Sequence, residues 1–237
     1  MKSILILFAF LSVSAAACAQ SFLPLDVGNR WAYTSDLVGP DIREVVYGPD
    51  PLFEDSYIIE YDVSDHSPGH RQFYGTNGEG DVFLYGFRRL EPRQSRYYDP
   101  PLQVVDAPLY AGKTWTVTTD ARETRDGGVL ATYTVQYTVT DPVTVTVGGV
   151  ERQAWGILEA VLPNPTADAG IGTTWTTDGR PFDLAKADDV IVPHWWVWGV
   201  GEVQYRSIGI FRLVDYFLNG TVGNQDLSVS ELKRAYR

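Results

Sequence analysis

The sequence predicts an all-β protein: a single curved antiparallel sheet or a half-open β-barrel, with a short C-terminal helix. Three observations support this fold class. Apolar and polar residues alternate over much of the chain, and aromatic side chains make up 13% of the 237 residues. Short turn motifs rich in glycine and proline separate the alternating segments. Together these features indicate strands that bury one face and expose the other.

The first 19 residues have the pattern of an export signal, which leaves residues 20–237 as a single β-rich domain. Lys2 supplies the positive start, residues 4–13 are apolar, and the residues that follow are small. No later stretch approaches the roughly 20 apolar residues that a membrane-spanning helix needs. We therefore expect an exported protein, periplasmic or extracellular, with no transmembrane span once the signal is removed.

Cys18 is the only cysteine, and the sequence leaves its role open. Cleavage at the small-residue site formed by Ala17 and Ala19 would remove it, so that the mature chain would start at Gln20. The alternative is a lipobox at residues 15–18, which would make Cys18 the lipidated first residue of an outer-membrane lipoprotein. In neither case does the chain form an internal disulfide, so its stability must come from the core.

The strands are predicted from alternation that stops at turn motifs, and they cover residues 29–37, 42–47, 56–63, 71–74, 81–87, 113–120, 129–140, 143–147, 150–161, 193–205 and 210–216. The first strand places Trp31 and Tyr33 on one face. Prolines between the second and third strands forbid a continuing ladder, which makes these two a hairpin. Asn77-Gly78 joins the fourth and fifth strands, because this dipeptide between apolar runs is a strong hairpin signal.

The most regular alternation lies in residues 129–140, where odd positions carry valine, alanine and tyrosine and even positions carry mainly threonine. This pattern indicates one buried and one wet side. The next strand repeats it, and Gly148-Gly149 then turns the chain. The most basic stretch, residues 88–98, is expected to pair with local carboxylates rather than to bind an anion.

Residues 163–186 are rich in loop signals, and we expect a long excursion over the barrel mouth or the sheet edge, with a helical turn at residues 183–187. The late strands then close the sheet beside the first one. Ser228 and Glu231 form a capping box, which predicts the C-terminal helix.

Trp195, Trp196 and Trp198 are the candidate ligand-facing residues. Because side chains alternate along a strand, Trp196 and Trp198 should share one face and Trp195 should lie on the other. If the sheet is half-open, one of these faces lines an apolar cleft.

The order of several motifs resembles a group of exported, β-rich bacterial proteins of uncharacterised function. Residues 24–33 are similar to the "PLxVGNxWxY" opening of that group, and residues 199–203 to its "GVGxV" closing motif. Residues 108–115 and 143–147 also resemble it. The resemblance implies a fold loosely similar to lipoprotein-carrier-like half-barrels, and it implies no functional residues, since the group has no established active site. The chain departs from the group at residues 147–150, where a "PAGTF"-like turn is expected.

The composition and the histidines argue against several functions. A formal net charge of −11 repels phosphate, which excludes nucleic acid as a partner. His66 and His70 have the spacing of helical zinc ligands, but Pro68 between them prevents a helix. His194 precedes a tryptophan pair and is interpreted as a packed strand residue. We therefore expect neither a metal site nor a cofactor.

The sequence favours a non-enzymatic exported β protein that holds an apolar small molecule, a lipid or a partner segment in the concave face of the sheet. One alternative is a structural or assembly lipoprotein of the envelope, lipidated at Cys18 and bound to an envelope protein. A second alternative is a carbohydrate-active enzyme that uses an aspartate pair, such as the adjacent Asp188 and Asp189.

Overall fold

A computed structural model describes residues 21–35, 40–50, 56–61, 70–89, 94–162, 174–175, 181–182, 193–206 and 210–218. Within these residues the chain forms the strands β1 (Arg30–Ser35), β2 (Asp41–Asp50), β3 (Ser56–Tyr61), β4 (His70–Thr76), β5 (Val82–Arg89), β6 (Gln94–Val105), β7 (Thr114–Arg122), β8 (Val129–Val139), β9 (Val143–Val147), β10 (Val150–Leu162), β11 (Thr174–Trp175), β12 (Pro181–Phe182), β13 (His194–Val197), β14 (Gly201–Arg206) and β15 (Ile210–Phe217). The described residues include no helix.

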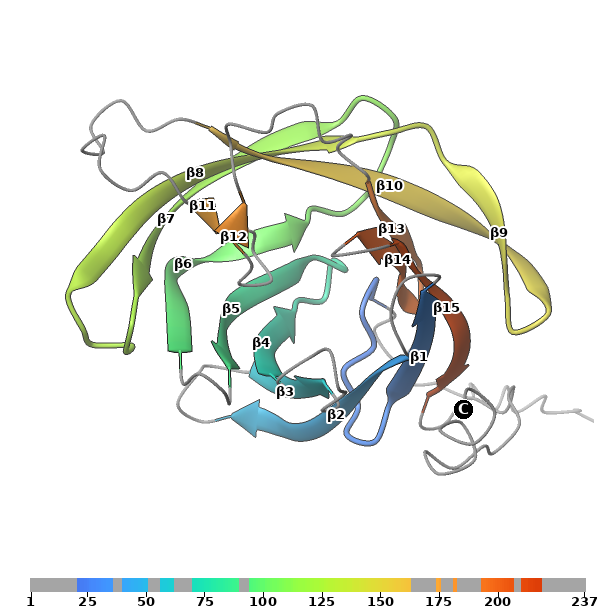
Figure 1. The fold of residues 1–237 in the computed structure, drawn as a ribbon. Coiled ribbons are helices and arrows are strands. Elements are labelled where there is room, and N and C mark those ends of the chain that lie inside the picture. Colours follow the sequence, from blue (N-terminus) through green and yellow to red (C-terminus); the bar gives the residue numbers. More distant parts are fainter. Residues whose placement is uncertain are drawn as a thin grey trace, which may run out of the picture.

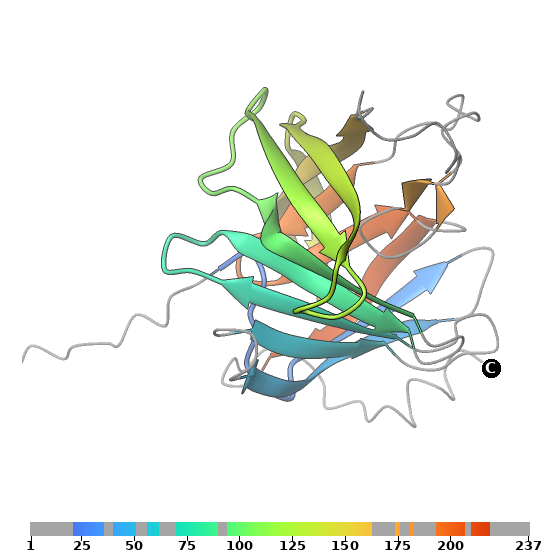
Figure 2. The ribbon, with the colours of Figure 1, turned by 90° about the vertical axis from the view of Figure 1, so that its left-hand side faces the viewer.

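The strands close into an antiparallel barrel of 12 strands (Figure 1). β1 to β8 pair in chain order, β10 follows β8, and β13, β14 and β15 lead back to β1. The pairing of β10 with β13 makes the closing contact, with Ala154 opposite Val197 and Ile157 opposite His194. The all-β antiparallel prediction is confirmed, while the half-open alternative is corrected to a closed ring. Turned by 90°, the strands are seen inclined to one another around the wall, as a closed barrel requires (Figure 2).

Alternation along the strands fills the interior. In β8 the predicted inward side is confirmed, since Val135, Tyr137 and Val139 are buried while the residues between them are half-buried. Trp31 and Tyr33 of β1 also belong to the core. Because period-two side chains face alternate sides of a sheet, this rhythm alone places the large rings inside the barrel.

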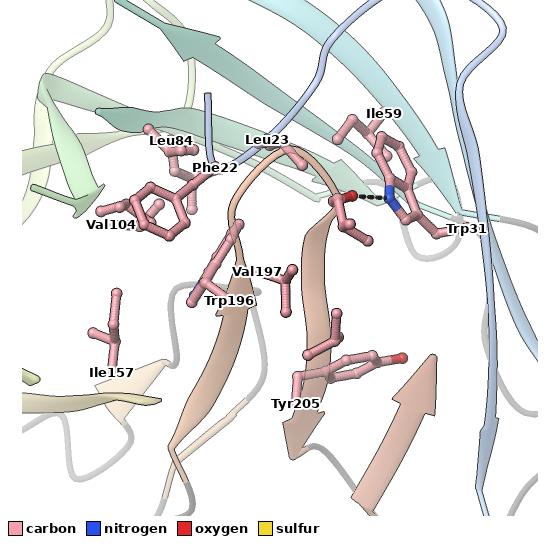
Figure 3. Close-up of a cluster of buried hydrophobic side chains, with 14 of the residues drawn as sticks. Phe22, Leu23, Trp31, Ile59, Leu84, Val104, Ile157, Trp196, Val197 and Tyr205 are labelled. Carbon is pink, nitrogen blue, oxygen red and sulfur yellow. Dashed lines mark hydrogen bonds between the residues drawn. The ribbon is translucent and has the colours of Figure 1, made fainter. Parts of the chain in front are cut away.

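One end of the barrel is closed by the residues that precede β1. Phe22, Leu23 and Leu25 are buried in the apolar core, and Figure 3 shows Phe22 and Leu23 near Trp196 and Val197 of β13. The segment is held there by backbone, since Gly199 N–H donates to Ser21 O at 3.0 Å.

The prolines of β6 interrupt its ladder with β7. Pro100 and Pro101 have no N–H to donate, and the register between the two strands is limited to three residue pairs. Side chains bond the backbone carbonyls instead: Thr119 Oγ1 donates to Pro100 O at 2.6 Å and Trp115 Nε1 donates to Gln103 O at 2.8 Å. The wall stays continuous because these two side chains replace backbone donors.

β9 and β10 form a hairpin that extends beyond the ring. Gly148 and Gly149 both have positive φ, at 58° and 75°, which is the conformation of the tight two-residue turn that fits twisted strands. β9 pairs with the first residues of β10 along their whole common length.

Several expected features lie outside the described residues: the export signal, the helical turn at residues 183–187 and the C-terminal helix. In the part of the chain that the structure describes, no helix has the length and apolarity needed to cross a bilayer.

Candidate functional site

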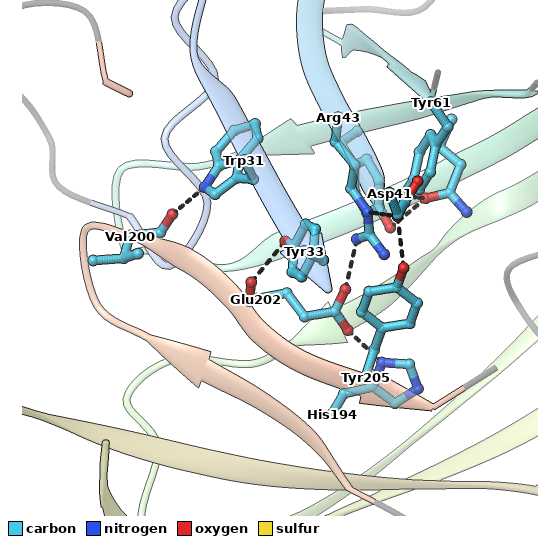
Figure 4. Close-up of polar contacts among 11 residues, drawn as sticks. Trp31, Tyr33, Asp41, Arg43, Tyr61, His194, Val200, Glu202 and Tyr205 are labelled. Carbon is cyan, nitrogen blue, oxygen red and sulfur yellow. Dashed lines mark hydrogen bonds and ion pairs between the residues drawn. The ribbon is translucent and has the colours of Figure 1, made fainter. Parts of the chain in front are cut away.

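A layer of polar side chains crosses the barrel interior where several strands begin or end (Figure 4). β1, β3 and β14 end here, while β2 and β13 begin. Register explains why these side chains meet, since Arg43 lies opposite both Trp31 and Tyr61 and must share their inward face. We call this set the polar layer, and its members are Tyr33, Asp41, Arg43, Tyr61, His194, Glu202 and Tyr205.

Arg43 is the centre of the polar layer. Its Nε donates to Asp41 Oδ2 at 3.0 Å and its Nη1 donates to Glu202 Oε2 at 2.8 Å. The guanidinium carbon also lies 4.0 Å from the ring centre of Tyr205, with the rings of Tyr33 and Tyr61 at 4.5 and 4.6 Å. Two carboxylates and three aromatic faces thus compensate a buried charge that would otherwise be costly.

Glu202 connects Arg43 to His194 of β13, the strand that closes the ring by pairing with β10. Its second carboxylate oxygen bonds His194 Nδ1, and its backbone carbonyl accepts the Tyr33 hydroxyl at 2.7 Å. Burial raises the pKa of this carboxyl, but His194 and Arg43 outweigh burial and leave the pKa below its ordinary value. Glu202 is therefore an ionised acceptor with both oxygens engaged.

The tyrosines of the polar layer act as neutral donors. The Tyr205 hydroxyl donates to Asp41 Oδ2 at 2.6 Å. Burial raises the pKa of Tyr33 and of Tyr205 well above the ordinary value, more than Arg43 lowers either pKa. A protonated phenol donates one hydrogen bond. Each of these tyrosines therefore donates to an acceptor oxygen, Glu202 O or Asp41 Oδ2, and also presents its ring face to Arg43.

A cavity of about 50 Å³ lies between the polar layer and the apolar core. Its walls combine aromatic, polar and aliphatic groups, and they are formed by Arg43, Tyr61, His70, Gln72, Tyr74, Leu84, Val104, Tyr137, Ile157, Glu159, His194, Trp196, Glu202 and Tyr205. Tyr61 and Tyr74 both donate to Gln72 Oε1, the latter at 2.8 Å. An engineered apolar cavity of ~150 Å³ accepts benzene, so this one takes only a smaller group.

Tyr137 lines the cavity, and among the tyrosines of the lining it is the one whose buried hydroxyl has no hydrogen-bond partner among the described residues. Its side chain is 1% exposed, and its ring stacks on Trp115 with the ring centres 5.1 Å apart. Burial raises the pKa of this phenol well above the ordinary value, with Glu159 acting in the same direction. A neutral buried O–H without an acceptor indicates a site that an acceptor can satisfy.

The three candidate tryptophans have different surroundings. Trp196 is 5% exposed and lines the cavity, while Trp195 is half-buried against the core. Trp198 is 39% exposed and packs edge-on against Phe22, with ring centres 4.9 Å apart. The expectation that Trp196 and Trp198 share a strand face is wrong, because β13 ends at Val197 and Trp198 lies in the following turn.

The remaining candidates are the aspartate pair, the lipidation site and the histidines. Asp188, Asp189, Cys18 and His66 lie outside the described residues, so the aspartate pair, the lipidation site and the histidine pair stay predictions. His70 stacks on Tyr61, with ring centres 3.9 Å apart. Within the described residues, no three histidine, cysteine or acidic side chains are close enough together to hold a metal ion.

A second hollow of about 320 Å³ lies between β5, β6 and the β7–β8 turn. It is lined mainly by tyrosines and by charged residues at strand ends, among them Tyr85, Tyr97 and Arg122. The Arg122 guanidinium already donates to Gly127 O at 2.7 Å. Because this hollow has no set of converging buried polar groups like the polar layer, it is the weaker candidate.

The polar layer was missed by the sequence analysis, although a signal existed. Asp41, Arg43 and Val45 alternate on one face of β2, so two charged residues share the face of a core valine. Such a conflict with the hydrophobic pattern is typical of a functional or internally paired site. Glu202 was hidden in a glycine-rich motif, where its partner 159 residues away leaves no local trace.

Comparison with known proteins gave no match among family models, curated proteins or solved structures. The resemblance to exported β-rich bacterial proteins therefore stays a prediction, and the function must be argued from the geometry of the cavity.

Proposed function

We propose that this is an exported, non-enzymatic binding protein whose barrel interior receives a short apolar group that carries a hydrogen-bond acceptor. The observation that supports the proposal best is the cavity below the polar layer, which is lined by Tyr137, whose hydroxyl is buried without a partner among the described residues. The group belongs to a small molecule or to a segment of a partner protein.

The size and lining of the cavity narrow the class of occupant. About 50 Å³ is far below the ~300 Å³ at which pockets for whole drug-sized ligands begin. Leu84, Val104 and Ile157 contribute aliphatic lining, while the buried, unpartnered hydroxyl of the lining residue Tyr137 is the available donor among the described residues. A chain end of a few heavy atoms with one carbonyl or ether oxygen fits these walls, whereas a complete lipid chain is too large.

The chemistry of the polar layer supports binding rather than catalysis. A general acid near neutral pH needs a raised carboxyl pKa, whereas the pKa of Glu202 is lowered. Both of its oxygens are occupied, one by Arg43 and one by His194. The layer is therefore an internally hydrogen-bonded cover over the cavity.

The first test is to identify the occupant. Protein purified from its own host is measured by native mass spectrometry, then extracted with solvent, and the released molecules are analysed. We expect a reproducible mass above that of the chain which disappears on extraction. A chain mass alone, together with an extract that matches the solvent blank, contradicts the proposal for a small molecule; pull-down of a partner segment then decides the remaining case.

Cavity variants make the test specific. Ile157→Phe fills the floor of the cavity, and Val46→Phe adds the same ring at an exposed position of β2 as a matched control. Only the first should lose the bound molecule. Tyr137→Phe removes the donor while keeping the ring, and we expect about fivefold weaker binding, since a net hydrogen bond contributes ~1 kcal/mol. Equal retention in all three variants would place the molecule elsewhere.

Export is tested separately by mass analysis of the mature N-terminus. A chain that starts at Gln20 supports cleavage after Ala19, while a lipidated Cys18 supports the envelope-anchored alternative.

A further inference from the structure

β9 carries the open edge of the sheet. In the described part of the chain every other strand of the large sheet has a neighbour on both sides, whereas β9 pairs with β10 alone. The pairing of β10 with β13 closes the ring, so among the described strands of the large sheet β9 is the one with a neighbour on a single side. Exposed edges present unpaired backbone donors and acceptors to any other strand.

The turn of the hairpin determines which groups face outward. Gly148-Gly149 joins Val147 to Val150, so this closing pair exchanges backbone hydrogen bonds, and so does every second pair behind it. The N–H and C=O groups of the intervening Thr144 and Thr146 are therefore directed away from β10. β9 thus offers two donors and two acceptors on its free side.

The sequence of β9 is palindromic, so it reads the same in both chain directions. It reads Val-Thr-Val-Thr-Val from residue 143 to residue 147, with Val145 at the centre. The strand contains none of the charged residues or prolines that commonly protect an edge. Val143 is 41% exposed, and both threonines are exposed. A palindromic, uncharged edge matches most simply a second copy of itself.

We infer that β9 pairs antiparallel with β9 of a second copy of this chain, about a two-fold axis at Val145. Valine then lies opposite valine and threonine opposite threonine, and Thr144 of each copy exchanges two backbone hydrogen bonds with Thr146 of the other. The register uses all the outward-facing groups and leaves the Val145 pair without hydrogen bonds between the copies. The contact is isologous, so it closes as a dimer and does not propagate.

One strand pair of this length is smaller than the ~1,000 Å² expected of a stable interface. The dimer therefore depends on protein concentration. Sedimentation velocity over a wide concentration series should show the average mass rising from that of one chain toward that of two.

Thr146→Pro tests the edge without disturbing the hairpin. The N–H of Thr146 bonds nothing within β9 and β10, so proline there removes a donor only from the dimer. We expect Thr146→Pro to stay monomeric at every concentration and Thr146→Ala, which keeps the N–H, to associate like the wild type. Equal association of the two variants would overturn the proposal.

Cysteine crosslinking tests the register. In full-length chains that carry Cys18→Ser, Val145→Cys places two thiols at the two-fold axis, with Cα atoms ~4.5 Å apart as in a non-hydrogen-bonded pair. That distance permits a disulfide. Val143→Cys is the matched control on the same strand, because its symmetry mate lies about four residues away along the pair. We expect an oxidised dimer only for Val145→Cys.

The remaining outcomes also decide the question. A wild-type chain that is monomeric throughout, or cysteine variants that crosslink equally, would contradict the pairing. Slow hydrogen exchange of the Thr144 and Thr146 amides in a monomer would assign the edge to another segment of the same chain, which also overturns the proposal.

Discussion

The Arg43 guanidinium donates to the Glu202 carboxylate at 2.8 Å, although 159 residues separate the two in the chain. β2 and β14 are not neighbours, since β1 and β15 lie between them in the wall. The ion pair therefore crosses the interior and fixes the distance between two parts of the ring that no backbone ladder joins directly. The stability of the closed barrel should depend on this pair more than on any pair at the surface.

Arg43→Met should destabilise the fold by about 3–5 kcal/mol, because it takes from Glu202 and Asp41 the buried guanidinium that both carboxylates share. The matched control is Arg71→Met, which breaks the ion pair with Glu60 at 2.8 Å, where both side chains are about 40% exposed. That change should cost less than ~1 kcal/mol. Urea denaturation of the three proteins gives both values, and equal losses would contradict the central role of Arg43.

Acid should weaken the protein through Glu202. The pKa of this carboxyl is lowered in the folded chain, so its contribution to stability is full above the ordinary pKa of 4.5 and is lost as the pH falls through the lowered folded value. Arg43 and His194 face the carboxylate from β2 and β13, and Asp41 shares Arg43.

Glu202→Gln should accordingly be less stable than the wild type at neutral pH, and its free energy of unfolding should fall less steeply between pH 5 and the acid limit. Unfolding curves at a series of pH values measure the slope. Glu151→Gln, at an exposed position of β10, serves as the control and should keep the wild-type slope. A steeper acid slope in Glu202→Gln would contradict the lowered pKa.

Tyr33→Phe should cost about 1 kcal/mol, since it removes the hydroxyl that bonds the Glu202 carbonyl at 2.7 Å and keeps the ring over Arg43. Tyr47→Phe makes the same chemical change at a side chain that is 50% exposed. Its effect should stay within ~0.5 kcal/mol. Thermal and chemical unfolding distinguish the pair, and a neutral Tyr33→Phe would mean that the carbonyl finds another donor.

Alanine substitutions at three glycines should distinguish the cost of backbone strain from the cost of steric crowding. Gly80 has φ +97°, and a Cβ there would lie 2.7 Å from the Trp198 ring. Gly149 has φ +75° with no atom within 4 Å, and Gly78 also has nothing within 4 Å. Substitution by alanine should therefore cost most at Gly80 (about 2–4 kcal/mol), about 1 kcal/mol at Gly149, and within ~0.5 kcal/mol at Gly78. Calorimetry would refute this order if Gly78→Ala were the most damaging.

The fold class could be read from the sequence because alternation is a local property. β8, with buried Val135, Tyr137 and Val139, follows the predicted face, and the Asn77 hairpin forms as expected, with Asn77 Oδ1 accepting the amides of Glu79 and Asp81 at 3.0 Å. β6 escaped prediction, because its two adjacent prolines contradict strand propensity and the strand is completed by side-chain donors from β7.

The candidate site was less accessible to sequence reasoning. Trp196 was singled out for its ring and does line the cavity. Arg43 and Glu202 were not singled out, because their interaction joins residues that are far apart in the sequence. The expected closure of the late strands beside the first is confirmed by the pairing of β15 with β1, but the pairing of β10 with β13 was not predicted, since the contact of Ala154 with Val197 depends on how far the whole sheet curls. Patterns of period two specify faces, and they say nothing of which strands meet after a full turn.

The adjacency of β1 and β15 has a consequence for how such a chain folds. Trp31 donates to the carbonyl of Val200 at 2.6 Å across 169 residues, so the seam forms only when nearly the whole domain has been synthesised. Contacts of such high sequence separation make folding slow. The ring therefore closes only after most of the chain has been made. A chain truncated before the last strands would be an open sheet with two unpaired edge strands.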